Sequence, residues 1–179
     1  ATTKPILVEN TYLVLTPSAK VAKKKVEAYA SFVESLRALP IVLDYHEHDI
    51  VTGTISHLPH IIAASLVNFV RDTDTKDELM KSLAAGGFKD ITRIASSSST
   101  MREHICAQNQ SNISQILGYY IETLNEAKKL VDARDSQGIY DMFHHSRNYR
   151  NSMPNGSAGQ IKRTFQIYCV LPDKHGLIA

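Results

Sequence analysis

The sequence contains 179 residues, 43% of them hydrophobic, and its 20 basic and 18 acidic residues leave a formal net charge of +2. A chain of this length can bury one substantial core, and so small a charge does not indicate a nucleic-acid partner. No run reaches the roughly 18 uninterrupted apolar residues of a membrane span, and the N-terminal residues lack the pattern of a signal peptide. We therefore expect a soluble, cytoplasmic protein that does not bind membranes.

The first element is predicted to be short. Apolar runs within residues 6–15 are closed by Thr16 and Pro17, a pattern typical of an edge strand. Because the first residue is alanine and not methionine, we interpret residues 1–16 as a strand or connector that follows material missing upstream.

A helix is predicted to begin after Ser18, which can serve as its N-cap, because apolar residues follow at near-helical spacing. Four lysines crowd its first half. Such a run favours a solvated face, with an anionic ligand as the alternative. Pro40 is expected to end this helix, a short buried strand follows at 41–43, and Asp44 or Asp49 caps the next helix.

Neither the histidines nor the cysteines make a strong metal-site pattern. His46 and His48 are two residues apart, so they do not share one face of a helix, and no further ligand follows at a diagnostic spacing. Cys106 and Cys169 are far apart in unrelated contexts, which favours neither a disulfide framework nor a CxxC metal site. We expect no metal and assign His48 a supporting role beside the motif two turns further on.

A strongly apolar helix is predicted over 50–70, and its few polar residues need an explanation because buried polar groups require partners. At about 100° per residue, Ser56 and His60 share a face and His57 lies on the adjoining strip. Pro59 removes one backbone donor, which predicts a kink one turn earlier with free carbonyls beside the histidines. A kink with free polar groups could form the wall of a pocket. In the alternative interpretation, the histidines lie in the core and form hydrogen bonds with backbone groups.

A second candidate segment follows a short amphipathic piece at 77–83. Gly86 and Gly87 are expected to stop that helix, since glycine permits positive φ and close backbone approach. Asp90 can orient a neighbour, and Arg93 has the planar fork suited to a carboxylate. The alternative is a helix C-cap followed by a surface arginine.

The remaining chain is predicted to be mainly helical. Apolar spacing indicates one long helix over 101–131, or two helices joined near Asn109. The pattern breaks at 132–138 and resumes at 139–149. Residues 152–162 are rich in turn formers and form a linker.

After the linker, residues 164–170 alternate like a strand, and residues 171–179 resemble the first strand-to-helix turn of an ACT domain, a small module that binds amino acids. The chain ends before the other strands of that fold. We therefore interpret 163–179 as a truncated ACT-domain start, which suggests that tyrosine or another amino acid regulates the parent protein.

The two candidate segments together resemble a known family. Ser-His-Leu-Pro-His at 56–60, followed by Gly-Gly-Phe-Lys-Asp-Ile-Thr-Arg-Ile-Ala at 86–95, is similar to the C-terminal helical domain of prephenate dehydrogenases, over about residues 9–149. The resemblance implies an all-α fold over 17–151: an interlocking dimerisation domain like the C-terminal domain of 6-phosphogluconate dehydrogenase-like enzymes, with short N-terminal and C-terminal strands.

The resemblance also implies a function. The family binds NAD on an N-terminal Rossmann domain, converts prephenate to 4-hydroxyphenylpyruvate by oxidative decarboxylation in tyrosine biosynthesis, and forms homodimers. The implied substrate-binding residues are His60, Arg93, Ser56 and Gly86, with Arg93 pairing with a carboxylate and Gly86 approaching from the same or the partner subunit. The implied supporting residues are His57, His48, Gly87 and Asp90.

Some of the family's parts are not expected in this chain. Its catalytic histidine and serine belong to the Rossmann domain, and no GxGxxG occurs in the 179 residues, so NAD binding cannot be complete here. We therefore predict no catalytic residues in this fragment and no activity of the fragment alone. Two alternatives stay open: an arogenate dehydrogenase, and a helical dimerisation module without activity.

Overall fold

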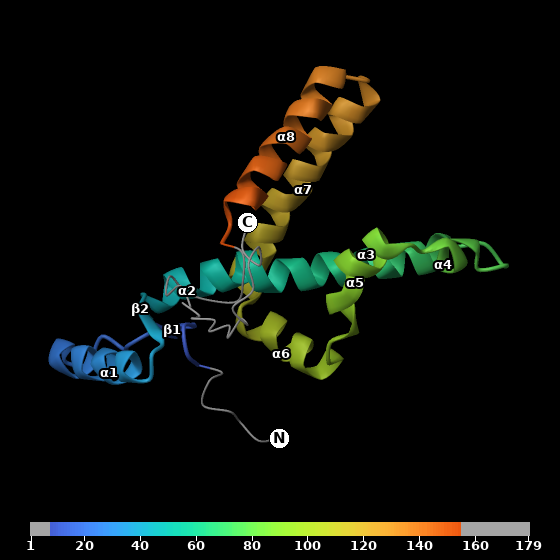
Figure 1. Ribbon diagram of the computed structural model, residues 1–179. Coiled ribbons are helices and arrows are strands. Elements are labelled where there is room, and N and C mark those ends of the chain that lie inside the picture. Colours follow the sequence, from blue (N-terminus) through green and yellow to red (C-terminus); the bar gives the residue numbers. More distant parts are fainter. Residues whose placement is uncertain (1–7, 155–179) are drawn as a thin grey trace, which may run out of the picture. The chain divides into compact units, whose positions relative to one another are not determined.

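The computed structural model describes residues 8–154 (Figure 1). The described part is mostly helical with two short strands, which confirms the predicted all-α class; the predicted C-terminal strand and ACT-domain start lie outside the described residues. The chain divides into two compact units. Within the described part, one contains residues 8–14 and 23–41, and the other contains residues 15–22 and 42–154.

The smaller unit is built on two paired strands and one helix. The strands are β1, Tyr12–Leu15, and β2, Leu39–Val42. Their pairing is extended by a bond from the Leu39 amide to the Thr11 carbonyl at 2.8 Å. Helix α1, Lys23–Ser35, buries Val33, which is 1% exposed. The strand predicted near the N-terminus is thus confirmed for its second half.

Two predicted boundaries of α1 are wrong. Ser18 does not cap the helix: its hydroxyl accepts from the Lys20 amide at 3.4 Å and its carbonyl accepts from the Val21 amide at 2.9 Å, which forms a separate turn. Pro40 does not end the helix either, because it lies within β2, where an edge strand tolerates the missing donor. The chain instead reverses at Arg37, whose φ is 61°.

The larger unit contains a continuous helical run with an irregular turn inside it. Helix α2, Tyr45–Thr52, is capped by Asp44, whose side chain accepts from the His46 amide at 2.9 Å, as predicted. The π-helical turn η2, Gly53–His57, leads into α3, Leu58–Thr73.

Pro59 accounts for this irregular turn. It has no N–H to donate to the carbonyl of Ile55, and its ring would clash with that carbonyl in a regular helix. The backbone widens instead, so that the Leu58 amide bonds to the Gly53 carbonyl five residues earlier. Pro59 was predicted to kink the helix near this point, and the structure has a π-helical turn there, an irregularity often found at functional sites.

The other helices of the larger unit follow in chain order. They are α4, Leu79–Leu83; α5, Gly86–Thr92; the 3-10 turn η3, Arg93–Ser96; α6, Ser99–Gln108; α7, Gln110–Asp132; and α8, Ser136–Ser152. Helices α7 and α8 pack against each other as a hairpin (Figure 1). Of the two alternatives that the sequence left open, two helices joined near Asn109 is the one found, because this residue separates α6 from α7.

The prediction for the glycine pair is wrong. Gly86 and Gly87 begin α5 and do not end α4, which stops at Leu83. Neither glycine adopts a positive φ. Apart from chain neighbours and the backbone of the same helix, no atom of the described residues lies within 4 Å of the Cβ that either would gain. Inside one protomer, neither position therefore requires glycine.

Gly53, by contrast, is required by a close crossing. It is buried, and a Cβ there would lie 2.8 Å from Cδ1 of Ile116 and 3.4 Å from Nδ2 of Asn109. The absence of a side chain at this position lets the turn η2 approach α7. This crossing joins the first candidate segment to the long helical hairpin.

The larger unit leaves much apolar surface uncovered. The run Tyr45–Thr73 is long and apolar enough, with a mean hydropathy of 1.5, to cross a membrane by length and composition alone, and only 17% of its most apolar window is buried. A helix this apolar is expected to be buried within its domain or a dimer, and within one chain most of it is not buried. Large exposed side chains on other helices, such as Phe143 at 64% exposure, show that the uncovered surface extends beyond this run.

The close contact between Gly53 and α7 predicts how substitutions at this position change the free energy of unfolding. Gly53→Val should lower the free energy of unfolding by about 1–3 kcal/mol, because a branched side chain overpacks the contact with α7. Gly118→Val is the matched control: Gly118 lies on α7 with no atom within 4 Å of its would-be Cβ, and its effect should stay within about 0.5 kcal/mol. Chemical denaturation measures both values, and equal effects would contradict the assignment.

Candidate functional site

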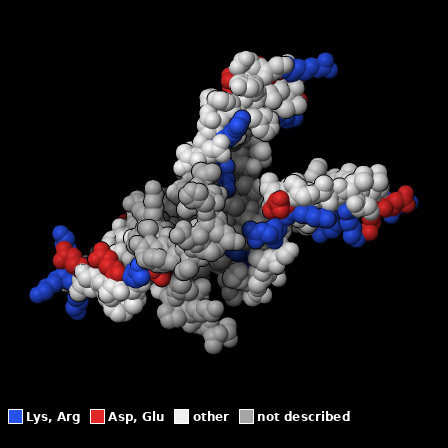
Figure 2. Space-filling model, in the orientation of Figure 1, with Lys and Arg blue, Asp and Glu red and all other residues white. Residues whose placement is uncertain are grey.

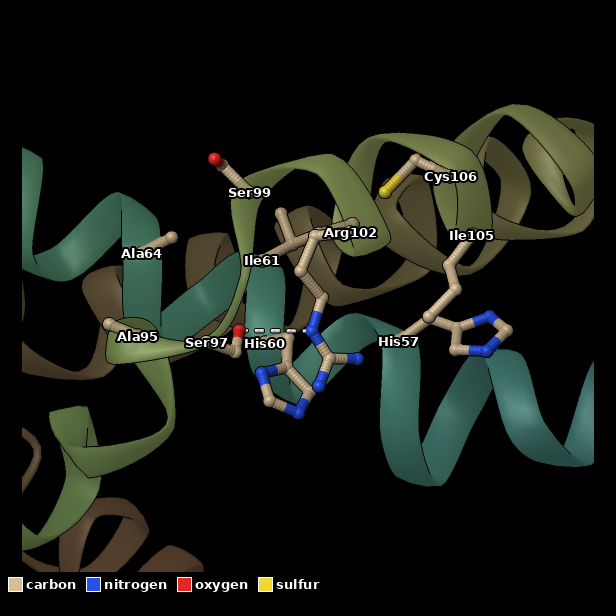
Figure 3. A pocket seen from close by; sticks show the side chains of 10 residues that line it. All are labelled: His57, His60, Ile61, Ala64, Ala95, Ser97, Ser99, Arg102, Ile105 and Cys106. Atoms are coloured by element: carbon tan, nitrogen blue, oxygen red, sulfur yellow. Dashed lines mark hydrogen bonds between the residues drawn. The ribbon is translucent and has the colours of Figure 1, made fainter.

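A cavity of about 280 Å³ lies in the larger unit between α3, the turn at η3 and α6. Figure 3 shows its lining side chains: the histidines come from the first candidate segment, Ala95 ends the second, and the other polar groups follow in residues 97–106. The lining residues are His57, His60, Ile61, Ala64, Ala95, Ser97, Ser99, Arg102, Ile105 and Cys106. Sites for small molecules typically measure about 300–1,000 Å³, so this cavity suits one small ligand.

His60 joins the two candidate segments directly. Its Nδ1 lies 3.0 Å from the carbonyl oxygen of Ile94, the residue after Arg93. A carbonyl only accepts hydrogen bonds, so Nδ1 carries the proton. In the neutral ring, Nε2 therefore has the free lone pair. This bond brings the first candidate segment into contact with the residue that follows Arg93, although the Arg93 side chain is not among the residues that line the cavity.

His57 has the opposite arrangement. Its Nδ1 lies 3.3 Å from the side-chain nitrogen of Asn109. An amide nitrogen only donates, so Nδ1 accepts and the neutral ring carries its proton on Nε2. The neutral histidines thus differ in tautomer: the free nitrogen of His57 is a donor and that of His60 is an acceptor.

Asn109 is the buried residue that holds His57. It is 8% exposed, and its side-chain nitrogen also donates to the Asp49 carbonyl at 2.8 Å. Its side-chain oxygen accepts from Asn112 at 2.8 Å, which fixes the orientation of the amide. Asn109 therefore connects α2, the π-turn and the start of α7 through one side chain.

The environment keeps His57 uncharged near neutral pH. Burial lowers the pKa of His57 below its ordinary value of 6.5, and the positive charge of Arg102 lowers it further. Asp49 acts in the opposite direction, while His48 and His60 add to the lowering. A neutral ring keeps the donor and acceptor assignment described above.

Arg102 brings a cation to the cavity, and sequence reasoning missed it. It lies in the first turn of α6, is half-buried, and its Nε donates to the hydroxyl of Ser97 at 3.0 Å (Figure 3). The only signal in the sequence was its spacing of three and four residues from Ile105 and Cys106, which also line the cavity. Such spacing places residues on one helix face, but it does not show what that face meets.

The other residues singled out from the sequence do not line this cavity. Ser56 is half-buried in the π-turn, and Arg93 is exposed at the start of η3. Gly86, Gly87 and Asp90 are exposed on α5, and His48 is half-buried with Nδ1 3.0 Å from Oδ1 of Asp49. Within one protomer the fold brings His57 and His60 into the cavity, and the roles of the others stay predictions.

The described residues contain no cluster of three or more histidine, cysteine, aspartate or glutamate side chains arranged to hold a metal ion. His46 is exposed and stacks against Tyr45, with ring centroids 3.8 Å apart. The nitrogen-bearing side chains that line the cavity are two imidazoles and one guanidinium, and Ser97, Ser99 and Cys106 add two hydroxyls and a thiol.

Known proteins resemble this chain over nearly its whole length. A family model described as "Prephenate dehydrogenase, dimerization domain" matches residues 44–145. Prephenate dehydrogenase of Bacillus subtilis (strain 168) is 35% identical over 179 residues, which is 100% of this chain and 48% of that protein. The chain thus spans about half the length of this relative.

Solved structures share the fold. Prephenate dehydrogenase from A. aeolicus, in complex with hydroxyphenyl propionate and NAD+, superposes with a TM-score of 0.74 at 28% identity, covering 79% of this chain and 50% of that one. Synechocystis arogenate dehydrogenase has a TM-score of 0.77 at 22% identity, covering 81% and 53%. The second likeness concerns the fold alone.

The lowered pKa of His57 makes a prediction about pH. Arg102→Gln should raise the pKa of His57 toward 6.5 without restoring it fully, because burial is the larger cause and remains. NMR titration of isotope-labelled histidine measures this shift, with Arg71→Gln, an exposed arginine paired with Asp72, as the control. An unchanged pKa in Arg102→Gln would contradict the proximity of the two groups.

The same shift fixes the sign of a stability effect. Since the folded-state pKa of His57 is below 6.5, the unfolded chain binds the proton more readily. Stability should therefore fall as the pH drops through about 6.5, and the fall should be smaller in Arg102→Gln.

Proposed function

This chain belongs to the prephenate dehydrogenase family through its dimerization domain, and on that basis we propose that it is the substrate-binding and dimerisation part of an NAD-dependent prephenate dehydrogenase. The full-length protein would convert prephenate to 4-hydroxyphenylpyruvate by oxidative decarboxylation in tyrosine biosynthesis. The observation that carries this proposal is the bond from His60 to the Ile94 carbonyl, which joins the two motifs of the family beside a cavity with a cation.

The cavity suits the chemistry of this substrate. Prephenate carries two carboxylates and a ring hydroxyl, and loss of hydride from the hydroxyl-bearing carbon accompanies the departure of carbon dioxide. A guanidinium and an imidazole N–H can bind a carboxylate, and an imidazole lone pair can accept from a hydroxyl. The role that we propose for this chain is to hold and orient the acid.

The described residues do not fit NAD. Their two strands pair in parallel, because the amides of Leu39 and Leu43 donate to the carbonyls of Thr11 and Leu15. Among the described residues, no strand leads through a glycine-rich turn into a helix, which dinucleotide binding requires. NAD serves as the hydride acceptor in the reaction, so we propose that the other half of the full-length enzyme binds it. The fragment alone should then be inactive.

Prephenate is favoured over arogenate by the cavity lining. Arogenate carries an amine where prephenate has a keto group, and a bound ammonium needs an acceptor such as a carboxylate. No aspartate or glutamate is among the residues that line the cavity in the described part of the chain. The cation Arg102 would oppose an ammonium placed nearby.

We propose that a second copy of this chain covers the exposed apolar surface and forms a homodimer. The matched family domain is described as a dimerization domain, and the apolar run Tyr45–Thr73 is mostly unburied in one protomer. A groove of about 480 Å³ beside it is lined by apolar side chains that include Ile50, Leu58 and Ile116. An exposed surface of this kind is typical of an obligate interface.

Arg93 and Gly86 belong to the same proposal. Both are exposed in one protomer, and the family resemblance implies that they contact the substrate. We propose that they complete the site when the dimer forms, in the same or the partner subunit, with Ser56 beside them. Regulation by tyrosine and a cytoplasmic location are also proposals; residues 163–179, on which the regulation depends, lie outside the described part.

The role of Arg93 is tested in the full-length enzyme. Arg93→Gln should raise the KM for prephenate about tenfold or more and leave the KM for NAD nearly unchanged, because it removes one partner of an ion pair with the substrate. Steady-state kinetics measures both constants. Arg71→Gln is the control, and an unchanged KM for prephenate in Arg93→Gln would discard this assignment.

The dimer is tested by placing a charge on the apolar surface. Phe143→Asp should shift the protein from dimer to monomer, because burying an unpaired carboxylate in the interface costs more than the lost contact alone. Arg147→Asp, at an exposed polar position on the same helix, is the control. Sedimentation velocity distinguishes the two states, and a monomeric wild-type protein would refute the proposal.

A further inference from the structure

Arg102 carries a charge that the described residues do not balance. Ser97 is its one hydrogen-bond partner there, through Nε, and no ion pair with an aspartate or glutamate forms within the described part of the chain. A half-buried cation beside an apolar wall loses hydration without a counter-charge. An anion in the cavity would restore that balance.

The hydrogen bond to Ser97 also positions the guanidinium. Ser97 lies between η3 and α6, and it occupies only the Nε of Arg102. The N–H groups of the two terminal nitrogens are therefore available to a ligand. Figure 3 shows the guanidinium extending from α6 toward the side on which His60 lies. A fork held in this way loses little conformational entropy when it binds a carboxylate.

His57 also lines the cavity and carries a donor. Its Nδ1 is occupied by Asn109, so its free ring nitrogen carries the proton. His57 and Arg102 both line the cavity, together with the apolar side chains of Ile61 and Ile105. The cavity thus combines a positive, donating part with an apolar part, which matches an aromatic ring that carries a short acidic side chain.

We propose that Arg102, held by Ser97 and assisted by the N–H of His57, binds the side-chain carboxylate of the substrate, the one that the product keeps. This inference rests on the proposed function. It assigns Arg102 to the retained carboxylate because a cation on the departing carboxylate would stabilise the ground state more than the transition state, in which that charge is lost. Arg102 lies outside both family motifs.

The test uses the full-length protein with NAD and two probes that differ at one group: 3-(4-hydroxyphenyl)propionate, and the corresponding alcohol, in which CH₂OH replaces the carboxylate. Calorimetry, by displacement where binding is weak, gives both affinities for the wild type, Arg102→Gln and Arg102→Lys. The preference for acid over alcohol should fall at least about tenfold in Arg102→Gln and less in Arg102→Lys, which keeps the charge without the fork. Arg71→Gln should leave it unchanged.

The outcomes separate this inference from the proposed function. If the wild type turns over prephenate and binds the acid, but Arg102→Gln keeps the wild-type preference, Arg102 does not bind this carboxylate and the inference is overturned. If Arg102→Gln loses affinity for both probes equally, the residue only supports the cavity, which also overturns it. A wild type that neither turns over prephenate nor binds the acid overturns the proposed function, and the inference with it.

Discussion

The buried amide of Asn109 is the interaction on which the rest of the site depends. One side chain bonds to the Asp49 carbonyl of α2, to the ring of His57 in the π-turn and to Asn112 of α7. A buried amide must satisfy its donors and acceptor or lose free energy, so these bonds select one arrangement of the three elements. The same arrangement sets the tautomer of His57, which connects the packing of the helices to the chemistry of the cavity.

The electrostatic character of the cavity follows from this packing. Burial and the charge of Arg102 both lower the pKa of His57, so the ring stays neutral and keeps a donor, whereas the bond from His60 to the backbone leaves an acceptor. Two identical residue types thus provide different groups because their fixed partners differ. Arg102 is the cation, and none of residues 8–154 places an acidic side chain in the lining, so the cavity is suited to an anion that also carries a hydroxyl.

The single chain accounts for only part of a working site. The apolar run Tyr45–Thr73 remains largely unburied, and Gly86 and Arg93 are exposed on the elements after it. A domain that leaves this much apolar surface to solvent gains stability by association. The matched family domain is described as a dimerization domain, which supports the proposal that a second copy covers this surface. In that proposal, Gly86 and Gly87, which no contact within one chain requires, would matter in the assembly.

Much of this fold could be predicted from local sequence. The Asp44 cap, the irregular turn before Pro59 and the helix break at Asn109 depend on residues within about one turn, and local sequence indicated where each would occur. The two motifs identified the family because their residues and their spacing can be read directly from the sequence. Only the tertiary structure showed that Asn109 bonds to His57, because these residues are 52 positions apart in the sequence. It alone also showed that Arg102 lines the cavity, because this depends on which face of α6 is covered. Helical periodicity places side chains on a face, but it does not specify what that face packs against.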